Sequence, residues 1–557
     1  MIGEGSAPPE EAAAAPVAAG RAQLARRAGV VSAAVLASRI LGVVREQVFA
    51  VFFGAGRELD AFITAFRIPN LLRDLFAEGA LSAAFVTTFT QHLERHGERA
   101  AWRLASLVLN TLVIVVGAIC VAGMWYSARL AAAIAPGFGA IPGKLELTAQ
   151  LTRLMFPFLL LVALAAVAMG ILNTKNRFGV PAAAASFFNL GSIVVGLACA
   201  WWMAPGYLAG IIHHAPPDAH DATEAARAIT GMAVGTLAGG VLQFLVQVPS
   251  LRAVGFRYRP ILDVRDPGLR QVMRLMAPAT IGAAAVQVNV FVNNNFASYL
   301  GNGPVSWLNV AFRFMQLPIG LFGVAIGTVT LPVVSRHVAR ADLSALRTTL
   351  REALELIALF CLPAAAGLAL FGVPVIGLIY EHGRFTVADT AAAAHALSGY
   401  ALGLAGYAGI KVLAPAFYAL DDARTPMLVS LLSIGVNYAL NWTLVRALGF
   451  GHVGLALSTS AVALGNCALL YVVLRRRVGR LGGNLSGAIG RIAAATLVMA
   501  LAAWALDLAV VRIPVQSAFA RHALRLAVAV PAAAAVFWGA CRVFGAPVPR
   551  RLPFLRR

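Results

Sequence analysis

The sequence has few charged residues, few cysteines and no long polar segment. Charged residues make up 12% of the 557 residues, whereas 60% are hydrophobic and the mean hydropathy is +0.78. Soluble domains carry about 25% charged residues, so this composition excludes an ordinary soluble enzyme, a disordered protein and a fibrous repeat. It indicates a polytopic membrane protein.

The five cysteines lie within apolar runs, with no CxxC pair and no neighbouring histidine. This pattern is typical of small buried hydrophobic side chains and does not indicate disulfides, redox chemistry or a metal site. We therefore expect no cofactor and no bound metal. The cysteines are Cys120, Cys199, Cys361, Cys467 and Cys541.

The net charge of +21 does not indicate a nucleic-acid-binding protein. No soluble segment is long enough to form a binding groove, and no patch combines aromatic with basic residues. The first 28 residues lack the apolar core and cleavage pattern of a signal peptide, and we expect them to form a flexible cytoplasmic tail. The positive charge is better explained by membrane topology.

About 20 apolar residues cross a bilayer, and the sequence predicts fourteen transmembrane helices in an all-α protein. Cytoplasmic loops hold an excess of Lys and Arg. Here 29 of them lie in the two tails and alternate gaps, 10 lie in the other gaps and 6 lie inside spans. This split predicts that both termini are cytoplasmic. The expected spans are centred near residues 41, 76, 117, 162, 191, 240, 284, 321, 359, 402, 436, 463, 499 and 534.

The chain also contains an internal repeat. The residues Ala65–Arg67 recur as Ala311–Arg313 at an offset of 246, and Pro181 matches Pro426 at an offset of 245. The repeat predicts two six-span halves of the same orientation, followed by two extra spans. Duplicated halves with a site between them are typical of transporters.

Charged residues inside spans cost about 2.5–3.5 kcal/mol at mid-bilayer and therefore mark candidate functional sites. The first expected span carries Ser38, Arg39, Arg45 and Glu46. At about 100° per residue, Arg39 and Glu46 share a face and Arg45 is turned about 100° from Glu46. We expect two positive charges and one negative charge in one broad sector of this helix.

The second expected span carries a stripe of charge. Asp60, Arg67, Asp74 and Glu78 lie within roughly 40° of one line along a helix, with Arg73 to the side. The alternative to a functional role is an internal ion-pair ladder, with Arg67 between Asp60 and Asp74. In either case the stripe must face protein or water rather than lipid.

The eighth expected span carries Arg313 and Gln316, with Ser306 at its outer end. No carboxylate lies within one turn of Arg313, so its partner must be another helix or an anionic ligand. Because the repeat places Arg313 opposite Arg67, we expect the arginines of both halves to line a net positive cavity at the central seam. Guanidinium groups suit phosphate, and a diphosphate could bind several of them.

Two other features carry less weight. The segment Gly137–Lys144 lacks the glycine spacing and the hydroxyl residue of a phosphate-binding loop. Asn437 and Asn441, one turn apart, could help to hold a cation, but ordinary hydrogen bonds between helices explain two neutral amides better.

Five segments of the chain resemble the MurJ (MviN) family of bacterial lipid II flippases. They cover residues 38–46, 60–86, 171–178, 305–332 and 411–426, and the second and fourth, DAFITAFRIPNLLRDLFAEGALSAAFV and VSWLNVAFRFMQLPIGLFGVAIGTVTLP, are specific to that family. The resemblance runs in order from about residue 29 to the end of the chain.

The resemblance implies a V-shaped pair of six-helix lobes, as in MOP/MATE-like transporters, followed by two helices that form a groove for the polyprenyl tail. The implied organisation is a flexible tail at 1–28, a first lobe at 29–251, a cytoplasmic linker at 252–274, a second lobe at 275–478, a lipid-tail groove at 479–545 and a basic cytoplasmic tail at 546–557.

The implied function is transport without chemistry on the substrate. The substrate would be lipid II, an undecaprenyl-diphosphate carrying a disaccharide-pentapeptide, moved from the cytoplasmic to the periplasmic leaflet of the bacterial inner membrane for cell-wall synthesis. The expected partners are lipid II, membrane lipid and the cell-wall synthesis machinery, with no nucleic acid.

The resemblance also implies roles for individual residues. It places the essential arginines of the family on Arg39, Arg45, Arg73 and Arg313, its cavity acids on Asp60 and Glu78, and its small polar cavity positions on Ser38 and Ser306. Together with the helix patterns, this assigns substrate binding to the four arginines. The expected cavity and gating residues are Ser38, Glu46, Asp60, Arg67, Glu78, Ser306 and Gln316.

The chain departs from the family pattern at three positions. Asp74 stands where a basic residue is common, Gln316 replaces a glutamate, and Asn441 falls where sodium-binding members have a carboxylate. The last departure argues against sodium coupling and favours the membrane potential as the driving force.

One alternative function stays open, and the others fit the residues less well. A related exporter of another lipid-linked saccharide would use the same charges, whereas an exporter of cationic drugs would need acidic cavity walls. An integral membrane phosphotransferase would need several carboxylates at a cytoplasmic metal site, where only Asp421 and Asp422 are available. A scaffold would not need arginines inside the membrane in both halves.

Overall fold

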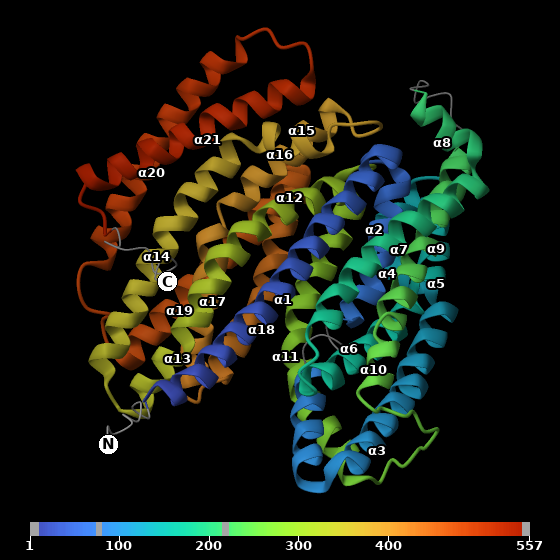
Figure 1. Ribbon diagram of the computed structural model, residues 1–557. Helices are drawn as coiled ribbons and strands as arrows, with labels where there is room; N and C mark the ends of the chain where they lie inside the picture. The colour runs from blue at the N-terminus through green and yellow to red at the C-terminus, as the bar shows by residue number, and fades with distance from the viewer. Residues whose placement is uncertain (1–9, 74–80, 214–221, 548–557) are drawn as a thin grey trace, which may run out of the picture.

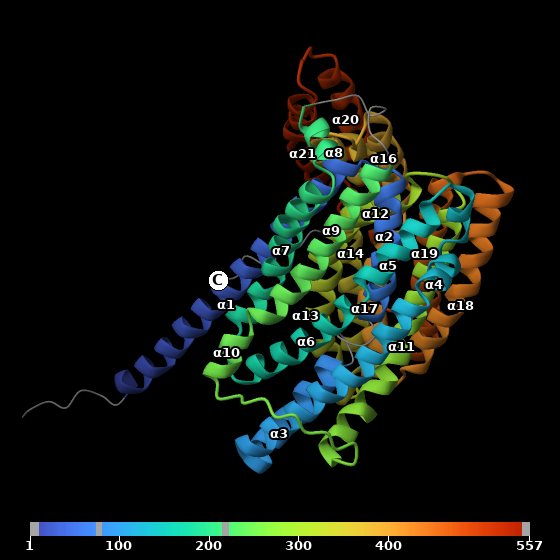
Figure 2. The same cartoon turned by 90° about the vertical axis from the view of Figure 1, so that its right-hand side faces the viewer.

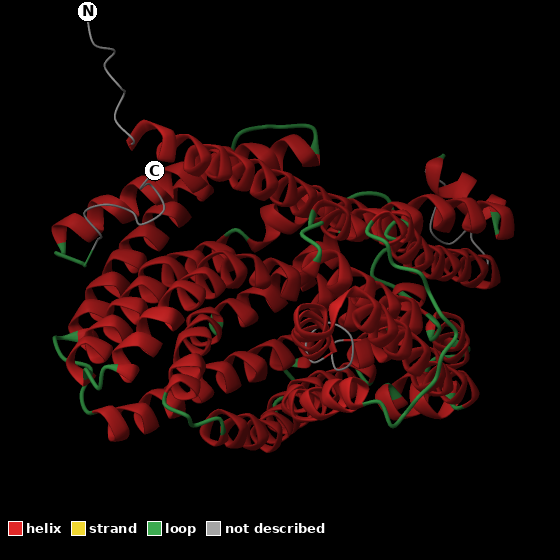
Figure 3. Ribbon diagram, turned by 60° about the horizontal axis from the view of Figure 1, so that its bottom comes forward, coloured by secondary structure: helices red, strands yellow, loops and turns green. Residues whose placement is uncertain are grey.

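The computed structural model describes residues 10–73, 81–213 and 222–547, apart from the side chains of residues 10–28, 30, 82, 83 and 277–286. Within these ranges the chain folds into helices joined by short loops and contains no strand (Figure 3). This agrees with the predicted all-α class.

The helices follow the order expected from the hydropathy pattern. The first half contains α1 (Glu10–Phe53), α2 (Arg57–Arg73), α3 (Ser82–Trp125), α4 (Ser127–Ile134), α5 (Lys144–Met155), α6 (Phe158–Thr174), α7 (Gly179–Met203), α8 (Pro205–Ile212), α9 (Ala222–Leu245) and α10 (Val248–Ala253). The second half contains α11 (Pro267–Ser298), α12 (Pro304–Pro318), α13 (Ala325–Ala339), α14 (Leu343–Leu370), α15 (Gly372–Tyr380), α16 (Val387–Ala401), α17 (Leu404–Ala419), α18 (Arg424–Asn441) and α19 (Gly451–Val478). The last two helices are α20 (Leu485–Val511) and α21 (Ala518–Val543).

Ten helical segments of the described chain are long and apolar enough to cross a membrane, or eleven if the bent pair α16 and α17 forms one span. These eleven match predicted spans one to one. The other three, centred near residues 41, 76 and 284, are not among them. The first two carry charges, and the second and third include residues or side chains outside the described part, so the predicted total of fourteen is not confirmed.

The two halves lie side by side, with α1 running along their junction (Figures 1 and 2). Helices α20 and α21 pack on each other, and they contact the second half through α14 and α15. In Figure 1 they cover the side of the second half that faces away from the first.

Glycines allow the closest helix contact of the first half. A Cβ atom at Gly231 would overlap the backbone of α7 near Ala200, and one at Gly235 would overlap Gly196. Small residues at such spacing let two helices approach within membranes, where packing rather than the hydrophobic effect drives association. This is why α7 and α9 are the most closely packed pair of helices.

The predicted gaps gather at two opposite ends of the molecule. The turn between α1 and α2 and the loop between α15 and α16 lie at one end, towards the top of Figure 1. The backbone of Arg384 in that loop contacts Val51, and Arg57 contacts Pro142. Helices α3 and α10 reach the opposite end, at the bottom of Figure 1, and Lys175, which follows α6, pairs with Glu98 of α3. We call these the upper and lower ends. The predicted topology, including the assignment of the lower end to the cytoplasm, stays a prediction.

Candidate functional site

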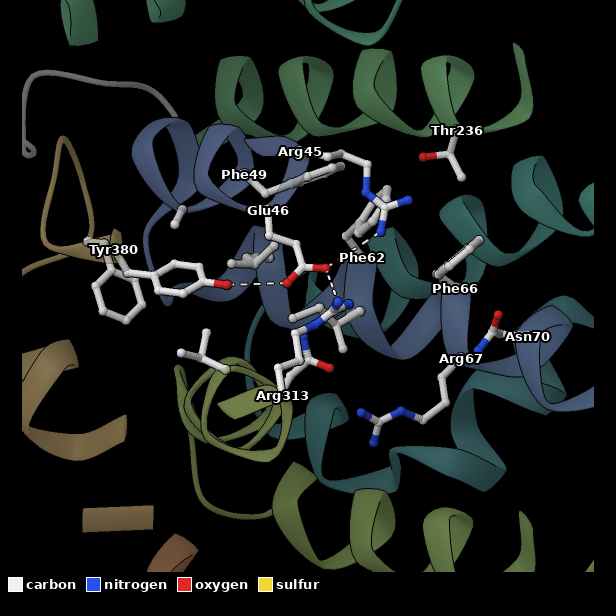
Figure 4. Close-up of a pocket in the computed structure, with 16 residues that line it drawn as sticks. Arg45, Glu46, Phe49, Phe62, Phe66, Arg67, Asn70, Thr236, Arg313 and Tyr380 are labelled. Atoms are coloured by element: carbon white, nitrogen blue, oxygen red, sulfur yellow. Dashed lines mark hydrogen bonds and ion pairs between the residues drawn. The ribbon is translucent and has the colours of Figure 1, made fainter. Parts of the chain in front are cut away.

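A cavity of about 150 Å³ lies at the junction of the two halves (Figure 4). Its charged lining residues are Arg45 and Glu46 on α1, Arg67 on α2, and Arg313 on α12. The two arginines at equivalent positions of the internal repeat therefore line the same cavity. Three arginines and one carboxylate give this lining a net charge of +2.

Glu46 is the centre of the charged cluster. Its carboxylate forms an ion pair with Arg313, lies 3.6 Å from Arg45 Nη2, and accepts a hydrogen bond of 3.2 Å from Tyr380 Oη. Figure 4 shows these three side chains arranged around Glu46. The Glu46 side chain is 12% exposed, whereas that of Arg313 is 46% exposed. Arg313 thus keeps much of its guanidinium available to an anionic ligand.

Arg67 lies apart from this cluster and links two cavities. Its Nη1 donates a hydrogen bond of 2.9 Å to Asn294 Oδ1 on α11. Arg67 also lines a second cavity of about 390 Å³, which extends into the second half among polar side chains that include Asn309 and Lys411. Polar groups therefore continue from the charged cluster into the second half.

The ion-pair ladder considered for α2 is not formed between Asp60 and Arg67. Seven residues of an α-helix rise about 10.5 Å, which is too far for a direct ion pair. Each side chain instead binds a partner on a different helix: Arg67 binds Asn294, and Asp60 binds Lys144. Asp74 lies outside the described residues.

Asp60 closes the upper end of the junction by capping a helix of the other half. Its carboxylate accepts hydrogen bonds from the backbone N–H groups of Gly303 and Ser306, at 2.7 and 2.9 Å, and from Ser306 Oγ at 2.7 Å. Gly303 is the N-cap of α12, and because glycine has no side chain it cannot cap the helix itself. A carboxylate there satisfies free N–H groups and complements the helix dipole.

Lys144 neutralises this cap. Its Nζ lies 3.0 Å from Asp60 Oδ2, donates to the carbonyl of Gly301 at 3.1 Å and to Asn302 Oδ1 at 2.9 Å, and lies 4.0 Å from the centre of the Phe138 ring. Both charged side chains are fully buried. We call Asp60, Lys144, Gly303 and Ser306 the upper gate, because α2 and α5 of the first half hold α12 of the second half here.

The remaining predicted site residues lie around this core. Ser38 is half-buried, and its carbonyl accepts a hydrogen bond from Asn189. Arg39 and Gln316 are exposed and do not line the charged cavity. Arg73, the last residue of α2, is half-buried and is not among the residues that line the charged cavity. Glu78 lies outside the described residues.

Ser306 differs from its expected position. It was predicted to line the central route, but it is fully buried beneath Asp60 in this conformation. The reason is the cap itself, because the Ser306 N–H and hydroxyl both turn towards the carboxylate.

The amides of the second half form a hydrogen-bonded network. Asn437 and Asn441 both donate to Asn293 Oδ1, at 2.9 and 2.8 Å, and Asn441 accepts a hydrogen bond from Ser458. Their amide groups thus bridge helices, as favoured from the sequence. In the described ranges no three His, Cys, Asp or Glu residues lie together in a way that could hold a metal ion.

Two residues of the site were not predicted. Lys144 lies in a short gap between apolar runs, and nothing in that segment indicates that its side chain is buried against Asp60. Tyr380 lies in a segment with no charge of its own, and nothing in the sequence indicated that it would reach Glu46.

We expect that exchanging Asp60 and Arg67 inactivates the protein. An arginine at position 60 would face Lys144 and could not accept the hydrogen bonds of Gly303 and Ser306, while an aspartate at position 67 would face the oxygen of Asn294. Abundance in the membrane and complementation of a depleted strain would be measured. An active exchange variant would mean that the two charges matter only as a pair.

The fold and this site define the class of protein: a membrane transporter made of two packed helical halves, with a positively charged cavity between them. A solved structure described as "Lipid II flippase MurJ, inward closed conformation" has a TM-score of 0.72 at 24% identity, with 92% of this chain and 98% of that chain covered. An inward-facing multidrug MATE transporter of the MOP superfamily has a TM-score of 0.65 at 15% identity, with 80% and 95% covered. These likenesses show the fold and agree with the predicted MATE-like architecture.

The sequence comparisons identify the family. The family described as "Lipid II flippase MurJ" matches residues 49–528. "Lipid II flippase MurJ" of Burkholderia cenocepacia is 35% identical, with 80% of this chain and 83% of that protein covered. "Probable lipid II flippase MurJ" of Rhizobium meliloti is 33% identical, with 92% and 93% covered. The chain belongs to the lipid II flippase MurJ family, and it is a transporter rather than an enzyme.

Proposed function

We propose that this protein moves lipid II from the cytoplasmic to the periplasmic leaflet of the bacterial inner membrane by alternating access. The observation that carries the proposal is the cavity between the halves, where the arginines outnumber the single lining carboxylate and come from both repeats. A diphosphate carries several charged oxygens, and planar guanidinium groups bind such oxygens in pairs.

In the proposed cycle, Arg45, Arg73 and Arg313 bind the diphosphate, with Arg39 guiding it from the exposed face of α1. In the closed conformation Glu46 holds Arg313 in place through an ion pair. When a diphosphate arrives, it competes with this carboxylate for the guanidinium groups. Release of Glu46 would then loosen the contact between α1 and α12, so substrate binding itself favours rearrangement of the halves.

The conformation described here is closed to the head group. Pockets for drug-sized ligands have volumes of about 300–1,000 Å³, and a disaccharide-pentapeptide is larger than such ligands, whereas the charged cavity measures about 150 Å³. Binding must therefore begin with separation of the halves. Because the buried upper gate is intact, the separation that admits substrate starts at the lower end.

The polyprenyl tail would lie outside the charged cavity. An apolar cavity of about 390 Å³ lies between α14, α17, α19 and α20, with Leu354, Leu413, Leu464 and Ile489 among its lining residues. It adjoins the segment 479–545 that was assigned to a tail groove. The proposed domain boundaries are lobes at 29–251 and 275–478, with a flexible tail at 1–28 and a basic tail at 546–557.

A depletion experiment tests the proposed substrate and direction together. Cells depleted of the protein should accumulate lipid II that is protected from an externally added enzyme that cleaves it, and re-expression should restore cleavage. If lipid II stays fully accessible during depletion, the proposed function is wrong. If another lipid-linked saccharide becomes protected instead, the protein serves that substrate, since the charged cavity recognises the diphosphate that both share.

Alternating access also predicts that a cysteine at position 306 changes its accessibility. In a variant whose five cysteines are replaced, Ser306→Cys should be unreactive to a membrane-impermeant thiol reagent in the closed state, because residue 306 is fully buried there. It should react from the periplasmic side when the upper gate opens, as after a change in membrane potential.

The matched control is a cysteine at Val387, which is 67% exposed at the start of α16, near the upper end. It should react equally in both conditions. Reactivity at 306 that never changes with state would argue for a static structure, and reactivity at 387 only from the cytoplasm would reverse the predicted orientation.

A further inference from the structure

A buried contact between a histidine and a glutamate connects α21 to the loop between α15 and α16. His522 Nε2 lies 3.4 Å from Glu381 Oε1, and the two side chains are only 4% and 8% exposed. The imidazole fits because residue 377 on α15 is a glycine, where a Cβ atom would lie 2.6 Å from Nε2. A buried carboxylate is costly unless it is paired, so His522 fixes the position of Glu381.

Glu381 directly follows Tyr380, and the two side chains bind in different places. While Glu381 reaches α21, Tyr380 Oη donates to Glu46 in the charged cavity at 3.2 Å. Tyr380 is itself buried, with 4% exposure. Because the residues are consecutive, the position of the backbone that His522 sets through Glu381 also determines whether Tyr380 reaches Glu46.

The same loop then binds the end of α1. The backbone N–H of Arg384 donates to the carbonyl of Val51 at 2.9 Å, and Arg384 Nη1 donates to Tyr207 Oη at 2.7 Å. Gly383 has a φ of +61°, and a Cβ atom there would overlap the Val51 carbonyl. The loop can therefore approach the first half this closely only if the backbone at Gly383 keeps this position.

We propose that His522 is a positioning residue of the transport cycle. By holding Glu381, it places the loop so that Tyr380 binds Glu46 and Arg384 binds the end of α1, and it thereby stabilises the closed upper end. The C-terminal helix pair is thus more than a surface for lipid, because it acts on the charged cavity through this loop. The inference rests on the proposed alternating access.

The test uses the full-length protein in cells, with Ser306→Cys as the reporter of the upper gate. His522→Ala should increase labelling of residue 306 from the periplasmic side about tenfold, the order expected for loss of one hydrogen bond to a charged group. Tyr380→Phe should have a similar effect. Because His522→Ala already releases the loop that places Tyr380, the double variant should be labelled no more than His522→Ala alone. His522→Gln, which keeps a donor near Glu381, should restore most of the protection.

The control is Asp507→Asn. Asp507 on α20 binds Arg525 on α21 through two hydrogen bonds of 2.8 and 2.6 Å, so this change weakens the helix pair without touching the loop. Labelling should stay at the parental level. An equal increase in Asp507→Asn would show that any loosening of the pair opens the gate, and would overturn the proposal.

Two other results would also overturn it. One is labelling of residue 306 in His522→Ala at the level of the parent, although the variant is present at normal abundance. The other is labelling in the double variant that equals the product of the two single-variant increases. If His522→Ala does not reach the membrane, Glu381→Gln tests the same link by the same criteria. If labelling of the parent never varies with state, the proposed function fails. If it varies while His522 has no effect, only this inference fails.

Discussion

Arg313→Ala is expected to abolish transport while leaving the abundance of the protein unchanged. Arg313 is more exposed than Arg45 and Glu46, with 46% of its side chain accessible, and is therefore the member of the cluster best able to contact a ligand. A hydrogen bond to a charged group contributes about 1.5–3 kcal/mol, so loss of a two-bond contact should reduce transport at least about a hundredfold. Removing a charge from a span does not add an insertion cost.

The measurement is protection of lipid II from an external cleaving enzyme in cells that contain only the variant, together with the amount of protein in the membrane. Arg313→Lys should also transport only weakly, because an ammonium group lacks the planar pair of donors that a guanidinium group offers to phosphate oxygens. The matched control is Arg336→Ala, since Arg336 is exposed on α13 and lies outside the charged cavity. A fully active Arg313→Ala variant would contradict the proposed site.

The charged cavity could be anticipated because it depends on patterns within single segments. The repeat placed Arg67 and Arg313 at equivalent positions, and both line the cavity. Helical periodicity placed Arg45 and Glu46 on adjacent faces of α1. The class of fold followed from hydropathy alone, since a chain with few charges can satisfy its backbone in a bilayer only within helices or closed barrels.

Asp60 and Ser306 are expected cavity or gating residues from the sequence, but the contacts of the upper gate could not be anticipated because the partners come from distant segments. Periodicity shows which residues share a face of one helix, but not which helix covers that face. Asp60 is 84 residues from Lys144 and 246 from Ser306, and these pairs depend on how α2, α5 and α12 pack. A lysine in a short gap looks like a solvated loop residue until a carboxylate from another helix is found beside it.

The upper gate supplies the second large expected effect, through Lys144→Met. In this variant the Asp60 carboxylate would keep the N–H groups of Gly303 and Ser306 but lose its counter-ion while fully buried. Breaking a buried ion pair by removing one partner costs about 3–5 kcal/mol. That cost falls on the closed upper end, because Asp60 can regain water when the halves separate there.

We therefore expect Lys144→Met to abolish transport. We also expect a cysteine at position 306 to react with periplasmic reagent at least about a hundredfold more in this variant than in the parent, which is the ratio that 3 kcal/mol produces. Adding Asp60→Asn removes the unpaired charge, and an amide oxygen can still accept from the N-terminus of α12, so closure should be largely recovered in the double variant. The control is Lys175→Met, because Lys175 pairs with a Glu98 side chain that is 62% exposed and such surface pairs contribute about 0–1 kcal/mol. If Lys144→Met behaves like Lys175→Met, the buried pair does not hold the upper end closed, and the gate must depend on the contacts of the α15–α16 loop with α1 instead.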